Sequence, residues 1–105
     1  MKLLEPLKIN QITLPNRVLV PAMVTRLSGE DGFVNEAVID RYAGFARGNV
    51  GLIVVEACAV HSSKSGPLLR LSDDKFIPGH RELTNRVHDI SDSKVVPQII
   101  HFMKV

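Results

Sequence analysis

GLIVVEACAV, residues 51–60, is a run of apolar residues broken only by Glu56. A continuous apolar run of this length, bounded by turns, is typical of a strand that is buried on both faces, as in a parallel sheet. Residues 17–21 and 94–100 are also rich in β-branched and aliphatic side chains and predict two more strands. The sequence therefore predicts three buried strands spread along the whole chain.

Amphipathic patterns lie between these strands. Apolar side chains recur at helical spacing through residues 35–48, which begin with Asn35, a good N-cap, and end with Gly48. The same spacing recurs through residues 78–91, where Pro78 suits the first turn of a helix. Each pair of successive strands is therefore predicted to be joined by one helix.

The predicted order is a short hairpin over residues 7–14 followed by β-α-β-α-β, which indicates an α/β fold with parallel strands and right-handed crossovers. A doubly wound dinucleotide fold would place G-x-G-x-x-G after its first strand, whereas residues 21–26 read PAMVTR. Long polar loops after the first two strands favour a (β/α)8 TIM barrel, whose active site lies at that end. A complete barrel takes about 250 residues. We therefore expect residues 1–105 to form the opening part of a barrel, incomplete in this chain.

The composition is that of a soluble globular protein, with 45% hydrophobic residues, 23% charged residues and a net charge of +2. No basic run predicts nucleic-acid binding, and no apolar stretch reaches the roughly 18 residues that span a bilayer. The N-terminus lacks the apolar core of a signal peptide. The single cysteine, Cys58, excludes an internal disulfide and a multi-cysteine metal site. We therefore expect a cytoplasmic protein without a metal, a nucleic-acid partner or a membrane partner.

Three blocks of sequence resemble one known family. LLEPLKINQITLPNRVLVPAM (residues 3–23), GLIVVEACAV (51–60) and VVPQIIHF (95–102) are similar, in this order and at these distances, to the N-terminal part of the old yellow enzymes, the FMN-dependent NADH:flavin oxidoreductases. The resemblance is closer to the 2,4-dienoyl-CoA reductase branch, where Met-x-Thr also follows the first strand. It implies a TIM barrel plugged at the bottom by the hairpin, with FMN over the carboxyl ends of the strands and NAD(P)H as reductant.

The resemblance also implies which residues contact the flavin. These cofactor-binding candidates are Ala22, Met23 and Val24 after the first strand, Ala57 in the second, and Gln98 in the third. Better-known members carry Thr or Cys at the position of Val24, so one alternative is a shift of register that gives the role to Thr25. The Gln98 amide can donate to and accept from the flavin pyrimidine edge. The alternative for Gln98 is a hydrogen bond to a neighbouring strand.

Several other residues have plainer interpretations. Pro97 lacks a ladder donor and predicts a local bulge beside the site. Glu56 is interpreted as a member of a structural ion pair rather than as a catalytic acid, and Cys58 as a small buried hydrophobe. Arg70 is placed in a solvated loop.

The predicted function is that of an N-terminal segment of an FMN-dependent oxidoreductase. The complete enzyme would pass hydride from NAD(P)H through flavin to an activated alkene, such as an enone or an enoyl-CoA. In the family the substrate-binding pair, the proton donor and the phosphate-binding loops lie later in the barrel, so the catalytic residues are expected downstream. The alternative is a non-catalytic barrel fragment that is stable only through self-association at its open sheet edges or with a partner.

Overall fold

The computed structural model describes residues 1–63 and 66–101. The elements are η1 (Lys2–Leu4), β1 (Leu7–Ile9), β2 (Ile12–Leu14), β3 (Leu19–Val20), α1 (Glu36–Arg47), β4 (Leu52–Ala59), β5 (Leu69–Arg70), η2 (Asp74–Phe76), α2 (Ile77–Ile90) and β6 (Lys94–Ile100). Both predicted helices, the hairpin and the three predicted strands are present. The strand β5 was not predicted, because two residues are too few to show a periodic pattern.

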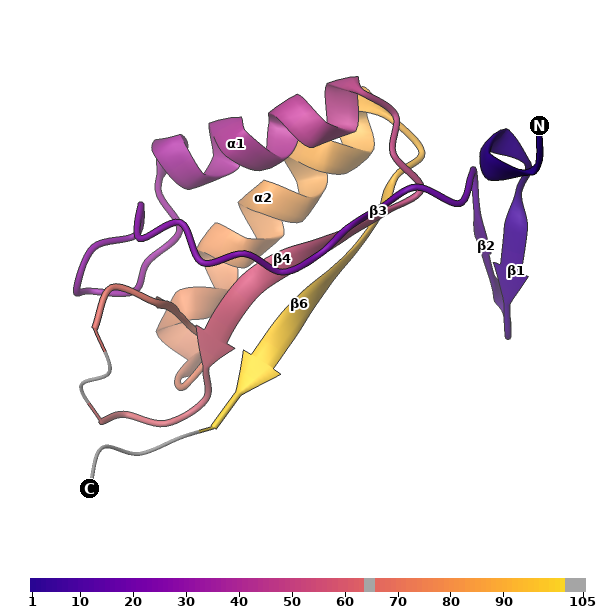
Figure 1. Ribbon diagram of the computed structural model, residues 1–105. Coiled ribbons are helices and arrows are strands. Elements are labelled where there is room, and N and C mark those ends of the chain that lie inside the picture. Colours follow the sequence, from indigo (N-terminus) through magenta and orange to yellow (C-terminus); the bar gives the residue numbers. More distant parts are fainter. Residues whose placement is uncertain (64–65, 102–105) are drawn as a thin grey trace.

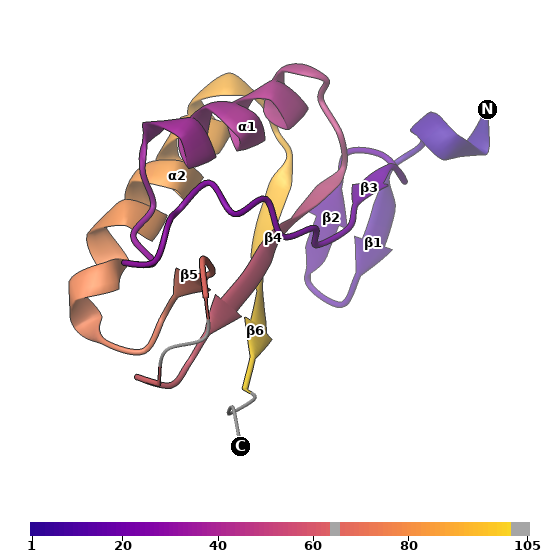
Figure 2. The ribbon, with the colours of Figure 1, turned by 60° about the vertical axis from the view of Figure 1, so that its left-hand side comes forward.

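The main sheet is parallel and is centred on β4. Strand β6 pairs with β4 along one edge, while β3 and β5 pair with the two ends of its other edge. Helices α1 and α2 lie together on one face of this sheet, and β5 lies beside the carboxyl end of β4 (Figures 1 and 2). The described residues thus form an α/β layer with parallel strands, as expected, and contain no closed barrel.

The hairpin stands apart from the helices. Strands β1 and β2 pair antiparallel, and Asn10 in their turn has a φ of 53°, a left-handed conformation that asparagine tolerates well. The hairpin lies near the end of the sheet from which β4 and β6 start (Figure 1). One backbone hydrogen bond, from the Arg17 N–H to the Leu3 carbonyl at 2.9 Å, joins its flank to the segment before β3.

Strand β3 is shorter than the predicted strand over residues 17–21. Only Leu19 and Val20 pair with β4, opposite Leu52 and Ile53. Pro21 follows at once, and proline has no N–H to donate to a ladder. The chain therefore leaves the sheet edge after Val20.

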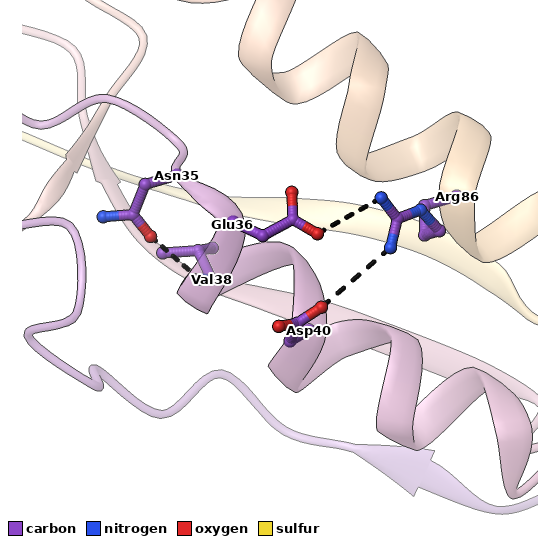
Figure 3. Close-up of polar contacts among 5 residues, drawn as sticks. All are labelled: Asn35, Glu36, Val38, Asp40 and Arg86. Carbon is purple, nitrogen blue, oxygen red and sulfur yellow. Dashed lines mark hydrogen bonds and ion pairs between the residues drawn. The ribbon is translucent and has the colours of Figure 1, made fainter.

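Helix α1 begins where the sequence predicts. The Asn35 side chain accepts a hydrogen bond from the Val38 N–H at 3.0 Å and so caps the helix (Figure 3). Arg86 of α2 forms ion pairs with Glu36 at 3.3 Å and with Asp40 at 4.0 Å, across the exposed seam between the helices (Figure 3). These pairs align α2 alongside the first turns of α1.

The ladder between β4 and β6 contains the bulge predicted beside Pro97. Val55 pairs with Pro97 and Cys58 pairs with Ile99, so two residues of β4 lie opposite the single residue Gln98. The extra residue is therefore in β4, within the pair Glu56–Ala57, and not in the strand that carries the proline. A bulge of this kind re-aims the side chains next to it.

The two faces of the sheet differ sharply in burial. Side chains of β3 and β4 pack under α1 and α2 in one apolar core, whose members include Val20, Ile53, Val55, Cys58, Tyr42, Leu83 and Val87. On the opposite face, Leu19 is 51% exposed and Val96 is 44% exposed. The helices therefore account for one face of the sheet only.

Candidate functional site

The five predicted cofactor-binding residues lie at the end of the sheet where the parallel strands have their carboxyl ends. Ala22, Met23 and Val24 follow β3 after Pro21, and Ala57 lies near the end of β4. The bulge places Gln98 of β6 across from Glu56–Ala57. Because parallel strands end at the same edge, three segments far apart in the sequence meet here. Their role in binding a cofactor stays a prediction.

Gln98 lies on the sheet face that the helices leave open. Val95 and Pro97 line a shallow apolar pocket beside α2. Successive side chains of a strand point to opposite faces, so Val96 and Gln98 point away from α2. The Gln98 amide is exposed and forms no hydrogen bond with the residues that the structure describes. The alternative partner on a neighbouring strand is therefore not observed, and both ends of the amide are available to a ligand.

The segment Ala22–Val24 is also open. Its backbone N–H and C=O groups form no hydrogen bond within the described part of the chain, and the side chains of Met23 and Val24 are exposed. Ala22 is half-buried and has no bulk beyond its Cβ. A planar ligand could therefore approach the backbone of this segment closely.

The contacts of Glu56 differ from those expected from the sequence. Its carboxylate is fully buried, and no cation lies within ion-pair distance of it among the described residues, so the expected ion pair is not observed there. The donors are neutral instead. The Thr25 N–H donates to Oε2 at 3.0 Å, the Thr25 hydroxyl donates to the carboxylate at 3.0 Å, and the Tyr42 hydroxyl donates to Oε1 at 2.9 Å.

These contacts bear on the alternative in which Thr25 faces the flavin. The Thr25 hydroxyl has one proton, which is directed at Glu56, and its oxygen accepts from the Leu27 N–H at 3.2 Å. A role at the cofactor would require Thr25 to give up its bond to a buried carboxylate. The geometry thus favours Val24 as the side chain that faces outward from this segment.

Tyr42 of helix α1 is the second residue that binds Glu56. Its hydroxyl accepts from the Glu56 N–H at 2.9 Å while it donates to the Glu56 carboxylate. Burial, more than any other cause, raises the pKa of Tyr42 well above its ordinary value, so the phenol keeps its proton. Tyr42 appears in the sequence only as one apolar residue of an amphipathic stripe, and periodicity gives no signal for this bond.

Cys58 and Arg70 complete the list of residues interpreted from the sequence. Burial, with a further contribution from Glu56, raises the pKa of the Cys58 thiol to about 12, which confirms a small buried side chain without nucleophilic character. Arg70 is not in a solvated loop, because it belongs to β5 and is only 7% exposed. Its guanidinium donates to the backbone carbonyls of His61 and Ser63 at 3.0 and 3.1 Å, which holds the loop after β4.

Histidines contribute packing at this end of the sheet. The rings of His61 and His101, which follow β4 and β6, meet edge to face at 5.4 Å between centroids. His80 on α2 contacts the Arg70 carbonyl through Nε2 at 3.0 Å, and burial lowers its pKa. Within residues 1–63 and 66–101, no group of three or more His, Cys, Asp or Glu side chains could hold a metal ion. No helix in the same residues is long and apolar enough to cross a membrane.

The sequence and the fold are similar to those of known proteins. The sequence model of the NADH:flavin oxidoreductase / NADH oxidase family matches residues 2–104. An NADH oxidase from Thermoanaerobacter brockii is 39% identical over 97 residues, which make up 90% of this chain and 15% of that protein. A bilirubin reductase from Mediterraneibacter gnavus is 39% identical over 101 residues, which make up 96% of this chain and 15% of that protein. The old yellow enzyme of Trypanosoma cruzi superposes with a TM-score of 0.83 at 28% identity, over 95% of this chain and 27% of that one.

These similarities define a class of flavin-linked oxidoreductases built on a TIM barrel. The chain belongs to the NADH:flavin oxidoreductase / NADH oxidase family. It spans about 15% of the length of the curated relatives that it matches. The resemblance to old yellow enzymes inferred from three sequence blocks is thereby confirmed.

Proposed function

We propose that this chain forms the first part of the FMN-binding TIM-barrel domain of an NAD(P)H-dependent oxidoreductase that reduces activated alkenes, of the enone or enoyl-CoA type. Family membership supports flavin-dependent oxidoreduction. The observation that carries the assignment of the site is the exposed amide of Gln98, which lies opposite the β4 bulge, on the open face of the sheet. In a complete barrel this face of the strand would be enclosed, and an enclosed primary amide needs polar partners, which a bound ligand can supply.

The residues at the carboxyl edge fit one side of a flavin. Gln98 would pair with the pyrimidine edge through its donor and acceptor groups. The free backbone of Ala22–Val24 and the small side chain of Ala57 would let the ring approach. When bound, the cofactor supplies the hydride chemistry, with NAD(P)H as reductant. The residues described here would bind and orient it, whereas proton transfer is assigned to residues of the complete protein outside them.

The test of this proposal is Gln98→Leu in the complete polypeptide that carries these residues. Leucine keeps the volume and removes the amide, so polar atoms of the flavin would be left unpaired. The expected loss is about 1–3 kcal/mol, or up to about a hundredfold in FMN affinity. Fluorescence titration of the apoprotein with FMN measures it.

Gln11→Leu is the matched control. It makes the same chemical change in the exposed turn of the hairpin, at the other end of the sheet. It should leave FMN affinity unchanged. If the FMN affinity of Gln98→Leu lies within twofold of that of the parent protein, the assignment of Gln98 to the flavin site is wrong.

The second candidate is a non-catalytic barrel fragment. Strand β6 pairs with β4 on one side only in the described residues, and its Val96 and Ile99 side chains are exposed. An open strand edge flanked by apolar side chains favours pairing with another chain. This candidate predicts self-association of residues 1–105.

A further inference from the structure

We propose that Glu56 is a positioning residue for the cofactor site, because its buried carboxylate holds the Ala22–Val24 segment in place beside Ala57. The inference rests on the proposed function, since it takes Ala22–Val24 to be the segment that contacts the flavin. It assigns to Glu56 neither the ion pair expected from the sequence nor a catalytic role. Glu56 acts through Thr25.

A carboxylate at this site carries an energetic cost. Glu56 is fully buried, and burial of an ionisable group is unfavourable unless its polar atoms are satisfied. Three donors converge on it from two residues, Thr25 and Tyr42. A hydrophobic residue of similar size would fill the same volume, so volume alone does not explain a carboxylate here. What the carboxylate adds is a pair of directed bonds to the segment after β3.

Val20 is the last residue of β3, and the ladder stops after it. Among the described residues, the backbone from Pro21 to Val24 forms no hydrogen bond, and the next one toward the sheet runs from the Thr25 N–H to Glu56. The proposed flavin-contacting segment is therefore held at one end by β3 and at the other by Glu56.

The position of Glu56 in β4 links it to the other parts of the site. It belongs to the bulged pair Glu56–Ala57, opposite Gln98. Its backbone N–H donates to the Tyr42 hydroxyl at 2.9 Å, and the same hydroxyl donates to its carboxylate, so α1 fixes both its main chain and its side chain. One residue thus joins the bulge, helix α1 and the segment after β3.

The experiment is Glu56→Gln in the complete polypeptide, which keeps the size of the side chain but replaces one acceptor oxygen with a donor NH₂. An NH₂ at the Oε2 position would meet the Thr25 N–H, which can only donate. An NH₂ at the Oε1 position would require the Thr25 and Tyr42 hydroxyls to turn from donors into acceptors. Either arrangement weakens the attachment of Thr25 to residue 56. In the apoprotein, hydrogen exchange of the Thr25 amide should become at least about tenfold faster, the equivalent of losing one hydrogen bond. The Kd for FMN should rise by about tenfold as well.

Two comparisons separate positioning from general destabilisation. Val87→Ala removes buried volume from α2 in the same core without touching the Thr25–Glu56 contacts. It should lower thermal stability and leave both the Thr25 exchange rate and the FMN Kd unchanged. Thr25→Ser keeps the backbone and hydroxyl donors and should behave as the parent protein does. If Glu56→Gln fails to fold, Thr25→Val removes the hydroxyl donor alone and should still weaken FMN binding several-fold.

Each outcome decides the proposal. FMN binding and Thr25 exchange within twofold of the parent in Glu56→Gln, or in Thr25→Val where that variant stands in, would overturn it while leaving the proposed function intact. Equal weakening of FMN binding by Val87→Ala would reduce Glu56 to a stability residue and overturn it too. A parent protein that binds no FMN would refute the proposed function, and the positioning role would fall with it.

Discussion

The two ends of the parallel sheet use their polar groups in opposite ways. At the amino end, the Asn16 side chain donates to the Asn49 carbonyl at 2.7 Å and accepts from the Val18 N–H at 3.0 Å, and the Ser93 hydroxyl donates to the Val50 carbonyl at 2.5 Å. These groups tie the turns before β3, β4 and β6 to one another. At the carboxyl end, the Gln98 amide and the backbone of Ala22–Val24 form no such bonds among the described residues.

The difference shows where the fold ends and where a site can begin. Asn16 and Ser93 are buried and satisfied, so their polar groups are spent on holding the strands together. The carboxyl end keeps unpaired donors and acceptors on an exposed surface, with Glu56 as its main internal tie. This is the distribution expected of a β/α barrel, whose amino end serves stability and whose carboxyl end serves function.

The largest expected effect concerns residues 1–105 expressed alone. The exposed side chains of Leu19 and Val96 and the open edge of β6 should drive self-association. We expect a colourless, self-associated or aggregated protein without ene-reduction activity, measured by size-exclusion chromatography with an absorbance scan from about 350 to 500 nm, where bound flavin absorbs. A monodisperse yellow monomer that oxidises NADPH in the presence of an enone would show that the carboxyl end is complete in this chain.

The next effect tests the amino end. A Cβ at Gly51 would collide with the backbone oxygen and carbon of Asn16, so Gly51→Ala must displace the turn that Asn16 holds. We expect a loss of about 1–3 kcal/mol in the free energy of unfolding. Thermal unfolding of the complete polypeptide, followed by circular dichroism, measures the change.

Gly44→Ala is its control. Gly44 is exposed in α1, and an added Cβ would have Arg47 Nη2 as its nearest neighbour at 3.7 Å. Replacing this helical glycine should stabilise the protein by about 0.5–1 kcal/mol. Equal tolerance of both substitutions would show that the amino end is not tightly packed at Gly51.

A smaller effect is expected at the carboxyl end, on the midpoint potential of the flavin. Val24→Thr should place a hydroxyl against the flavin and raise its midpoint potential. A net hydrogen bond of about 0.5–1.5 kcal/mol corresponds to about 10–30 mV for a two-electron couple. A redox titration that showed no shift for Val24→Thr, with a clear shift for Thr25→Val, would mean that Thr25 is the residue facing the ring.

The smallest effect concerns a polar contact that belongs to neither end of the strands. The Arg86 pairs with Glu36 and Asp40 are exposed, and exposed ion pairs are worth about 0.2–1 kcal/mol each at most. Arg86→Ala should lower the unfolding midpoint only slightly and leave FMN affinity unchanged. A marked loss of FMN affinity in this variant would extend the functional region onto the helix seam.

The sequence by itself determined the order of the hairpin, the three predicted strands and the two helices, together with the Asn35 cap, the bulge near Pro97, and the family. These features depend on local patterns or on blocks of residues that occur in a fixed order, and both can be read along the chain. The candidate residues Ala22, Met23, Val24, Ala57 and Gln98 also came from the sequence, through the resemblance, and their role stays a prediction.

Only the tertiary structure decided what Glu56 and Arg70 contact. The bonds from Thr25 and Tyr42 to Glu56 span 31 and 14 positions, and no periodicity marks residues that meet at such separations. The sequence placed Arg70 in solvent because β5 is only two residues long, and the carbonyls that hold its guanidinium, those of His61 and Ser63, come from a different segment of the chain. Buried polar groups are satisfied by whichever donors the packed elements bring within reach, and that choice is made when the elements pack.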